Sequence, residues 1–285
     1  TRWHQGSPYN LLCPMDEGSG EHCVAGCSPI AMSQIMYYHR YPEHGYGKAF
    51  YNWGDKQIGA DLTESVYNWA DMKPYYSGAE SQDSQLAVAQ LVRDAGFALN
   101  TNYDLSSSST ANLEPVKALV DHFNYDKSIR RLTQWLFDDE EWYSILFVEL
   151  AAGRPIFYSA QNGASEGHSL ICDGYDADGN LHFNFGWGGN ADGYYNPALM
   201  QYNKNAEVLI NIKPDEGGEV SLDPYCYTDF LYDGTHLNIG FQIQAGGSQN
   251  TPYLFAFELT DRSTGKKYNS SVMHSDFAYA WMEMV

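Results

Sequence analysis

The feature that most constrains this chain is a cysteine at the start of a helix-forming, apolar stretch. Residues 26–41 have the sequence GCSPIAMSQIMYYHRY, with apolar side chains at helical spacing. Pro29 fits a first helical turn, and Pro42 ends the pattern because proline disfavours helical geometry in the preceding residue. Cys27 therefore lies at or next to the amino end of a buried helix. Free N–H groups and the helix dipole favour a thiolate there, although most free cysteines are simply small buried apolar residues.

The charge balance narrows the possible partners. The 285 residues include 36 acidic and 16 basic ones, for a net charge of −20, and Lys and Arg do not cluster. This argues against nucleic acid and anionic membranes as partners. No apolar stretch approaches the roughly 18 residues that a membrane-spanning helix needs, so we expect no membrane span.

The composition is typical of a folded, exported protein. Aromatic residues are abundant, with 23 Tyr, 13 Phe and 7 Trp, and lysine is scarce. The chain starts at Thr1 without an initiator methionine or a signal peptide, which predicts a processed form.

The five cysteines predict neither a disulfide framework nor a metal site. Their odd number leaves at least one thiol unpaired, and their density is too low for a disulfide-rich scaffold. Cys23, Cys27, His22 and His39 could be drawn as a metal cluster, but no second Cys-x-x-Cys or His-x-x-x-His completes a zinc pattern. We therefore expect no metal and no other cofactor.

The first half of the chain is predicted to be mainly helical. Residues 1–20 are polar and rich in turn residues, which indicates an extended leader on the surface. Residues 43–64 predict loops with short strands. Further helices are expected at 83–95 with Gly96 as the stop signal, at 113–123 with Asn112 or a neighbour as the cap, and at 138–152.

The pattern then changes to the alternation typical of strands. Strands are expected at 155–159, 168–175, 181–185 and 208–212. Residues 176–180 predict a hairpin turn; a calcium loop would need glycine at Leu181 and glutamate at Trp187. Residues 213–218 have the composition of a linker. Alternation resumes at 219–228, 236–244, 253–259 and 266–273, which predicts a sandwich-like all-β module.

A cysteine nucleophile needs a base, donors for the oxyanion and a group that orients the base. His168 follows Gly167 at the start of an apolar strand, where its side chain can meet a helix terminus. Asn184 precedes a glycine- and aromatic-rich stretch, FGWGG, which would suit orienting and shielding an imidazole. Taken singly, an ordinary strand-end histidine and a packed glycine-rich turn explain the same residues.

Taken in order, these motifs resemble the streptopain family of papain-like cysteine peptidases, in its Bacteroidetes-type form. The resemblance rests on QGxPYNLL from Gln5, GCxxxAxxQIMxYH from Gly26, Gly167-His168, Asp173-Gly174 and NxGWGG from Asn184. It runs through residues 1–212. Further matches are Tyr67-Asn68-Trp69, Tyr-Ser-Gly at 76–78 and the serine-rich loop at 106–109.

The resemblance implies a role for each of five residues. Cys27 would be the nucleophile, and His168 the general base and acid. Gln5, with the backbone N–H of Cys27, would form the oxyanion hole. Asn184 would orient His168, and Trp187 would shield the pair from water.

The resemblance also implies an α+β fold and a biological setting. It predicts a papain-like peptidase domain at residues 1–213. The alternation that follows predicts a β-rich module at 219–285, whose pattern reaches Val285 without an obvious ending. It implies a secreted endopeptidase acting on protein and peptide substrates. It further implies a zymogen whose inhibitory pro-segment would precede Thr1.

Two departures and two alternatives accompany this interpretation. Ser28-Pro29 replaces the small β-branched residues expected after the cysteine, and Phe185 replaces a second tryptophan. One alternative is another acyl-transfer enzyme on the same scaffold, such as an amidase or a transglutaminase. The other is a catalytically silent binding or adhesion protein.

Overall fold

The structure is a computed structural model that describes most of the chain. It describes residues 1–110, 114–217, 225–232, 237–244, 253–255, 258–260, 264–269 and 273–275. The helices are α1 (Cys27–His39), α2 (Gln82–Ala98), α3 (Glu114–Phe123) and α4 (Asp139–Ala151), with 3-10 turns η1 (Leu62–Glu64) and η2 (Gln134–Leu136). The strands up to residue 217 are β1 (Lys48–Trp53), β2 (Lys56–Asp61), β3 (Arg130–Thr133), β4 (Ile156–Gln161), β5 (Gly167–Tyr175), β6 (Leu181–Asn184), β7 (Gly193–Tyr195) and β8 (Lys204–Ile210).

Helix α1 is the predicted helix, and its ends have clear physical causes. Gly26 precedes it at φ 93°, a conformation that residues with a side chain rarely adopt. Arg40 ends it in the left-handed conformation, with its N–H bonded to the carbonyl of Met36. Residues 28–37 are all buried, so α1 is a core helix rather than an amphipathic surface helix.

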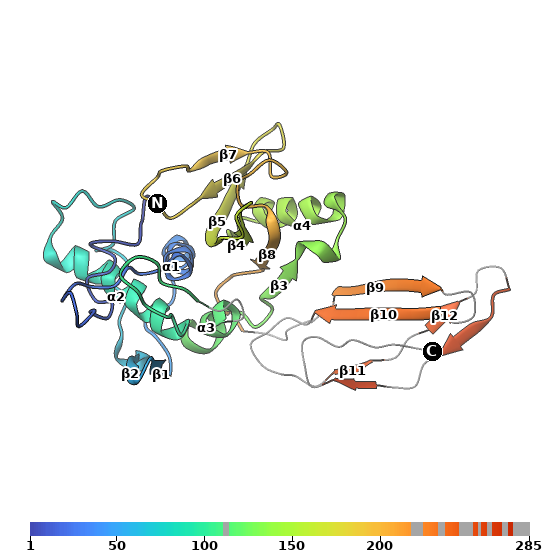
Figure 1. The fold of residues 1–285 in the computed structure, drawn as a ribbon, viewed down its shortest axis with the longest axis horizontal. Helices are drawn as coiled ribbons and strands as arrows, with labels where there is room; N and C mark the ends of the chain where they lie inside the picture. Colours follow the sequence, from blue (N-terminus) through green and yellow to red (C-terminus); the bar gives the residue numbers. More distant parts are fainter. Residues whose placement is uncertain are drawn as a thin grey trace.

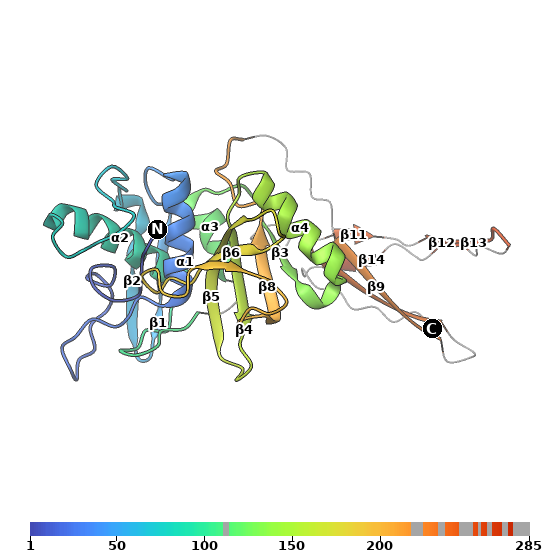
Figure 2. The ribbon, with the colours of Figure 1, turned by 90° about the horizontal axis from the view of Figure 1, so that it is seen from above.

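An antiparallel six-stranded sheet forms the second half of the fold, in the order β3-β8-β4-β5-β6-β7. Helix α1 packs against β5 and also against α2, while α4 packs against β4 and β5. Figures 1 and 2 show α1 between α2 and the sheet, with α4 on the other side of the strands. Residues from the two halves therefore meet where α1 faces β5.

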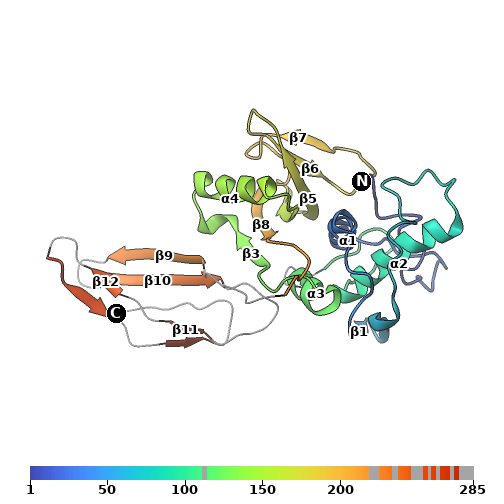
Figure 3. The ribbon, with the colours of Figure 1, turned by 180° about the vertical axis from the view of Figure 1, so that it is seen from behind.

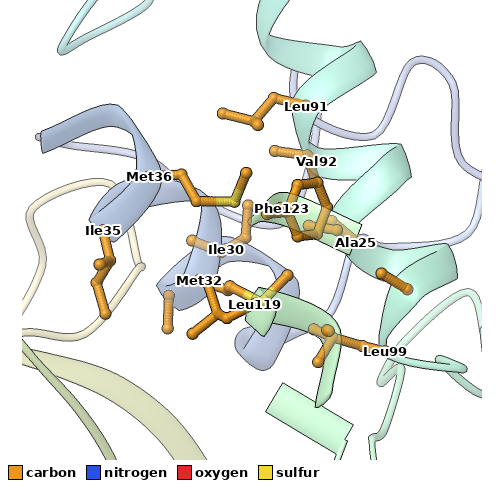
Figure 4. Close-up of a cluster of buried hydrophobic side chains, with 14 of the residues drawn as sticks. Ala25, Ile30, Met32, Ile35, Met36, Leu91, Val92, Leu99, Leu119 and Phe123 are labelled. Carbon is orange, nitrogen blue, oxygen red and sulfur yellow. The ribbon is translucent and has the colours of Figure 1, made fainter. Parts of the chain in front are cut away.

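Alternate residues of a strand point to opposite faces of the sheet, and the central strands are buried on both faces. Phe157 of β4 and Ile171 of β5 belong to the hydrophobic cluster around α1. Their neighbours Tyr158 and Leu170 belong to a second cluster, which includes Trp142 of α4. Figure 4 shows part of the first cluster, where side chains of α1 meet those of α2 and α3.

The prediction of a surface leader at residues 1–20 is wrong for residues 3–13, whereas residues 17–20 are exposed. Trp3, Tyr9 and Cys13 are buried, with at most 3% of their surface exposed. The Trp3 indole N–H donates to the carbonyl of Lys73 at 2.9 Å. Although polar and turn residues dominate this segment, the burial of its few large aromatic side chains holds it against the core. In Figure 3 the N-terminus lies between α1 and the end of the sheet that carries β6 and β7.

Gly96 does not stop its helix. Helix α2 runs through it to Ala98, and a Cβ at Gly96 would lie 2.0 Å from the hydroxyl oxygen of Tyr103. Because Gly96 has no side chain, Tyr103 can pack closely against the helix at this position.

The other elements mostly match the predictions. Helices α3 and α4, the β1–β2 hairpin, strands β4 to β6 and the turn at 176–180 lie where expected. Strand β8 begins at residue 204 and ends at 210, rather than running from 208 to 212. Strands β3 and β7 were not predicted, and Asn112 lies outside the described residues.

The C-terminal region contains strands, as its alternation predicts. They are β9 (Tyr225–Tyr232), β10 (Leu237–Gln244), β11 (Tyr253–Phe255), β12 (Glu258–Thr260), β13 (Lys267–Asn269) and β14 (Met273–Ser275). Within the described part of this region, β9 pairs antiparallel with β10, β11 with β14, and β12 with β13. The sandwich itself and the domain boundaries stay predictions.

Two further observations concern the described residues as a whole. None of their helices is long and apolar enough to cross a membrane. Cys13, Cys23, Cys27 and Cys172 are free thiols, and the side chain of Cys226 lies outside the described residues.

Candidate active site

Cys27 is the first residue of α1 and is partly exposed, whereas residues 28–37 of the same helix are buried. No side chain caps this helix end, because the residue before Cys27 is glycine. The first N–H groups of α1, including that of Cys27, therefore have no side-chain acceptor and can serve a bound anionic oxygen. The loop at 104–108 supports this end through Ser108, whose hydroxyl donates to the carbonyl of Val24 at 2.6 Å.

His168 lies at the start of β5 and is 7% exposed. Its hydrogen bonding and its charge both act on the thiol of Cys27, so the structure brings together the two residues that sequence analysis paired across 141 positions. Burial alone raises the pKa of the Cys27 thiol. The hydrogen bond and charge of His168, the backbone N–H of Ser169 and the side chain of Ser28 outweigh it, and the pKa lies below its ordinary value.

A backbone carbonyl, rather than Asn184, holds the histidine ring. The Nε2 atom of His168 lies 2.8 Å from the carbonyl oxygen of Phe185. Since a carbonyl only accepts, Nε2 carries the hydrogen in this contact, which leaves Nδ1 for Cys27. The carbonyl of Phe185 thus orients the ring of His168.

Asn184 instead ties the start of the chain to the sheet. Its Nδ2 donates to the carbonyl of Thr1 at 2.9 Å, and its Oδ1 accepts the N–H of Gly186 at 3.0 Å. Among the described residues, no hydrogen bond joins Asn184 to His168. Both ends of the Asn184 amide are engaged elsewhere, and the orienting role that the resemblance implies for Asn184 stays a prediction.

Asp192 fixes Phe185 from the other side. Its Oδ1 accepts the backbone N–H of Phe185 at 2.9 Å. Burial raises the pKa of this half-buried carboxyl, while the N–H of Phe185 and the charge of His182 act in the opposite direction. Both backbone groups of Phe185 are thus bonded, the N–H to Asp192 and the carbonyl to His168.

Three aromatic rings surround the imidazole of His168. The centroid of the Trp187 ring lies 4.7 Å from that of His168, and those of Tyr202 and Phe185 lie 5.2 Å and 6.2 Å away. Trp187 thus lies beside the imidazole, and its shielding role stays a prediction. Phe185 stacks within 12° of the imidazole plane in place of the expected tryptophan. Tyr202 was not predicted, because nothing in the sequence near it marks a site.

Gln5 reaches the site through the N-terminal segment. Its carbonyl accepts the N–H of Ala25 at 2.9 Å, two residues before Cys27. The carbonyl of Trp3 accepts the N–H of Gly188 at 2.9 Å, and Gly188 follows Trp187, one of the aromatic residues around His168. Residues 1–5, which we call the N-terminal strap, thus bond to both halves of the fold. The strap brings the backbone of Gln5 next to the start of α1, as an oxyanion-hole role needs.

A cysteine at a helix N-terminus, paired with a histidine on an adjoining antiparallel sheet, defines the class of papain-like cysteine peptidases. Comparison with known structures agrees. Active interpain A, a cysteine protease of Prevotella intermedia, superposes with a TM-score of 0.66 at 29% identity, covering 73% of this chain and 91% of interpain A. A mutant prointerpain A fragment gives the same TM-score and identity, covering 75% of this chain and 71% of the fragment.

Sequence comparison specifies the family. The model of the Peptidase C10 family matches residues 3–195, and the chain belongs to this family. The thiol protease/hemagglutinin PrtT of Porphyromonas gingivalis is 34% identical over 74% of this chain and 26% of its own length. Streptopain of Streptococcus pyogenes serotype M28 is 31% identical over 74% of this chain and 60% of its own length. The chain thus spans about a quarter of the first relative and three fifths of the second. These relatives do not favour the two alternative interpretations.

Proposed function

We propose that this chain is a cysteine endopeptidase that hydrolyses peptide bonds through a Cys27–His168 pair. The observation that carries the proposal is the partly exposed thiol at the start of α1, with a lowered pKa and a hydrogen bond to His168. The family and the interpain A fold support the same chemistry.

The mechanism follows from the two partners. The thiolate of Cys27 attacks the carbonyl carbon, and the oxyanion is bound by the N–H of Cys27 and the side chain of Gln5. His168 protonates the leaving amine through the nitrogen that faces the sulfur. It then takes a proton from water, which attacks the acyl-enzyme and releases the second product. The carbonyl of Phe185 holds the other ring nitrogen throughout.

The biological setting is part of the proposal. The substrates are proteins and peptides, and the enzyme is secreted and made as a zymogen. The export-type composition supports secretion. The zymogen proposal is supported by the similar fold of a prointerpain A fragment. The C-terminal β-rich module at 219–285 forms a second domain.

Casein cleavage by single variants tests the catalytic roles. Cys27→Ala is expected to abolish cleavage, whereas Cys172→Ala, which changes a fully buried thiol on β5, keeps it. Gln5→Ala is expected to lower kcat by about 10²- to 10³-fold, as the loss of one oxyanion donor does. Casein cleavage that survives Cys27→Ala would overturn the proposal.

The same assay separates hydrolysis from acyl transfer to an amine. With an added primary amine, a hydrolase is expected to release free carboxyl termini as its main products. Amine-linked peptides as the main products would favour the amidase- or transglutaminase-like alternative instead.

A further inference from the structure

Three serine hydroxyls lie in a row beside the catalytic sulfur. Ser28 follows Cys27 in α1 and is 7% exposed, and its Oγ lies 2.9 Å from the Oγ of Ser169. Ser169 follows His168 in β5 and is 8% exposed, and its Oγ lies 2.9 Å from the Oγ of Ser159 in β4. Ser159 and Ser169 are also direct partners in the β4–β5 register. Three elements thus each contribute one hydroxyl to a continuous row.

The row ends at the sulfur of Cys27. Ser28 is the next residue after Cys27, and hydrogen bonding by its side chain and by the backbone N–H of Ser169 lowers the pKa of the Cys27 thiol. The other titratable side chains that act on this sulfur are His168 from β5 and Tyr202, whose ring lies 5.2 Å from the imidazole. The mechanism above uses His168 and leaves the serines without a role.

The chemistry of hydroxyl groups gives the row a direction. A hydroxyl donates one hydrogen and accepts others, whereas a thiolate only accepts. With the O–H of Ser28 directed at the sulfur, the oxygen of Ser28 is free to accept from Ser169, and Ser169 from Ser159. All three O–H dipoles then point toward the negative charge, and each bond polarises the next.

We propose that Ser28, Ser169 and Ser159 form a hydroxyl chain that stabilises the thiolate of Cys27 in addition to His168. The proposal rests on the proposed peptidase function, because it assigns positioning residues to that same nucleophile. Ser28 and Ser169 act directly on the sulfur, and Ser159 orients the hydroxyl of Ser169. Filling space alone would not require hydroxyl groups at three adjoining positions, two of which, Ser28 and Ser169, are buried.

Alkylation of Cys27 across pH tests the chain without requiring turnover. The rate of iodoacetamide modification, followed by mass spectrometry of the Cys27 peptide in the full chain, rises with the thiolate fraction. In Ser28→Ala, the midpoint of this rise is expected to move up by about one pH unit, as for the loss of one hydrogen bond to a charged group. Ser28→Thr keeps a hydroxyl and is expected to stay near the wild-type midpoint.

The same helix offers a matched control. Ser33 is fully buried in α1, and its hydroxyl has no hydrogen-bond partner among the residues that the structure describes, so Ser33→Ala is expected to leave the midpoint unchanged. If Ser28→Ala does not fold, Ser159→Ala carries the test, because Ser159 is only partly buried and lies farthest from the sulfur. Its midpoint is expected to rise by a smaller amount. A midpoint equal to that of the wild type, in whichever of the two variants folds, would overturn the hydroxyl chain.

Casein cleavage distinguishes a failure of the hydroxyl chain from a failure of the proposed peptidase function. If Cys27→Ala abolishes cleavage while Ser28→Ala and Ser159→Ala titrate like the wild type, only the hydroxyl chain fails. If cleavage survives Cys27→Ala, the peptidase assignment fails, whatever the titrations show.

Discussion

Phe185 holds His168 through its backbone, and this arrangement makes a prediction for single residues. Asp192→Ala leaves the N–H of Phe185 without its acceptor and loosens the carbonyl that orients the imidazole. We expect kcat to fall about five-fold, as for a hydrogen bond of about 1 kcal/mol, with KM little changed because substrate is not contacted. Steady-state kinetics on a peptide substrate measures both constants.

Asp192→Asn is the matched variant for this prediction. It keeps an oxygen that accepts the N–H of Phe185, so it should retain most of kcat. Equal losses in the alanine and asparagine variants would show that the charge of Asp192, and not its hydrogen bond, supports the site.

A second residue-scale prediction concerns acid stability. Glu80 accepts backbone N–H groups of Ser77 and Gly78, which lower its pKa from 4.5 to about 2. A carboxyl with a lowered folded-state pKa stabilises the fold above its unfolded pKa and loses that contribution as pH falls toward its folded pKa. Glu80→Gln should therefore be less stable than the wild type at pH 6, and this difference should vanish near pH 2.

Denaturant unfolding at a series of pH values measures the effect. Asp55→Asn changes an exposed carboxylate in the β1–β2 turn and serves as the control. A stability difference for Glu80→Gln that stays constant from pH 6 to pH 2 would contradict the assignment.

The ordered motifs predict Cys27, His168, Gln5, Asn184 and Trp187 as site residues, and their individual roles stay predictions. No motif predicts the carbonyl of Phe185 as the acceptor for His168, because every residue has a carbonyl. Ser28 departs from the small β-branched residue that the resemblance leads us to expect after Cys27. Its consequence is a hydrogen bond to Ser169, 141 positions away, which no local pattern reveals.

Among the secondary-structure elements, the N-terminal strap carries the strongest prediction. Trp3 is fully buried and its backbone carbonyl bonds to Gly188. Trp3→Ala should lower the free energy of unfolding by about 3–5 kcal/mol, as large-to-small core substitutions do. Met15→Ala, at a residue of the same region that is 51% exposed, should change it by less than about 0.5 kcal/mol. Equally small changes in the free energy of unfolding for both variants would support the surface leader that the sequence predicts.

Helix α2 offers a test of close packing. Gly96→Ala places a Cβ against the hydroxyl of Tyr103, and we expect a loss of about 1–3 kcal/mol in stability. Helix propensity alone predicts a gain of about 1 kcal/mol. In a Tyr103→Phe background the nearest clash is removed, so the cost of Gly96→Ala should shrink. A stabilised Gly96→Ala variant would show that propensity outweighs packing here.

Periodicity predicted the long elements well and the short ones poorly. Helix α1 and strand β5 have sustained apolar patterns, and both lie where expected. Strands β3 and β7 have four and three residues, too few to show a period. Glycine is a typical helix stop, yet Gly96 lies inside helix α2, where Tyr103 packs closely against it.

At the scale of the whole molecule, both described hydrophobic clusters lie within residues 3–212. The end of this region contacts the rest of the fold. Pro214 forms an isolated antiparallel β-bridge with Tyr125, and the Lys213 amine lies 3.5 Å from the Asp126 carboxylate. We therefore expect residues 1–217 to fold alone and to cleave casein. Thermal unfolding within a few degrees of the full chain would support this boundary. Aggregation or loss of cleavage would show that the peptidase region needs the strands that follow.

The central claim is that Cys27 and His168 form a reactive pair, and one labelling experiment tests it most directly. The full chain is treated with one equivalent of iodoacetamide at pH 6, mapped by mass spectrometry and assayed on casein. We expect selective modification of Cys27 with parallel loss of cleavage, and neither selectivity nor cleavage in His168→Ala. Equal labelling of the accessible thiols, with Cys27 no faster in the wild type than in His168→Ala, would contradict the pair and make Cys27 an ordinary core cysteine.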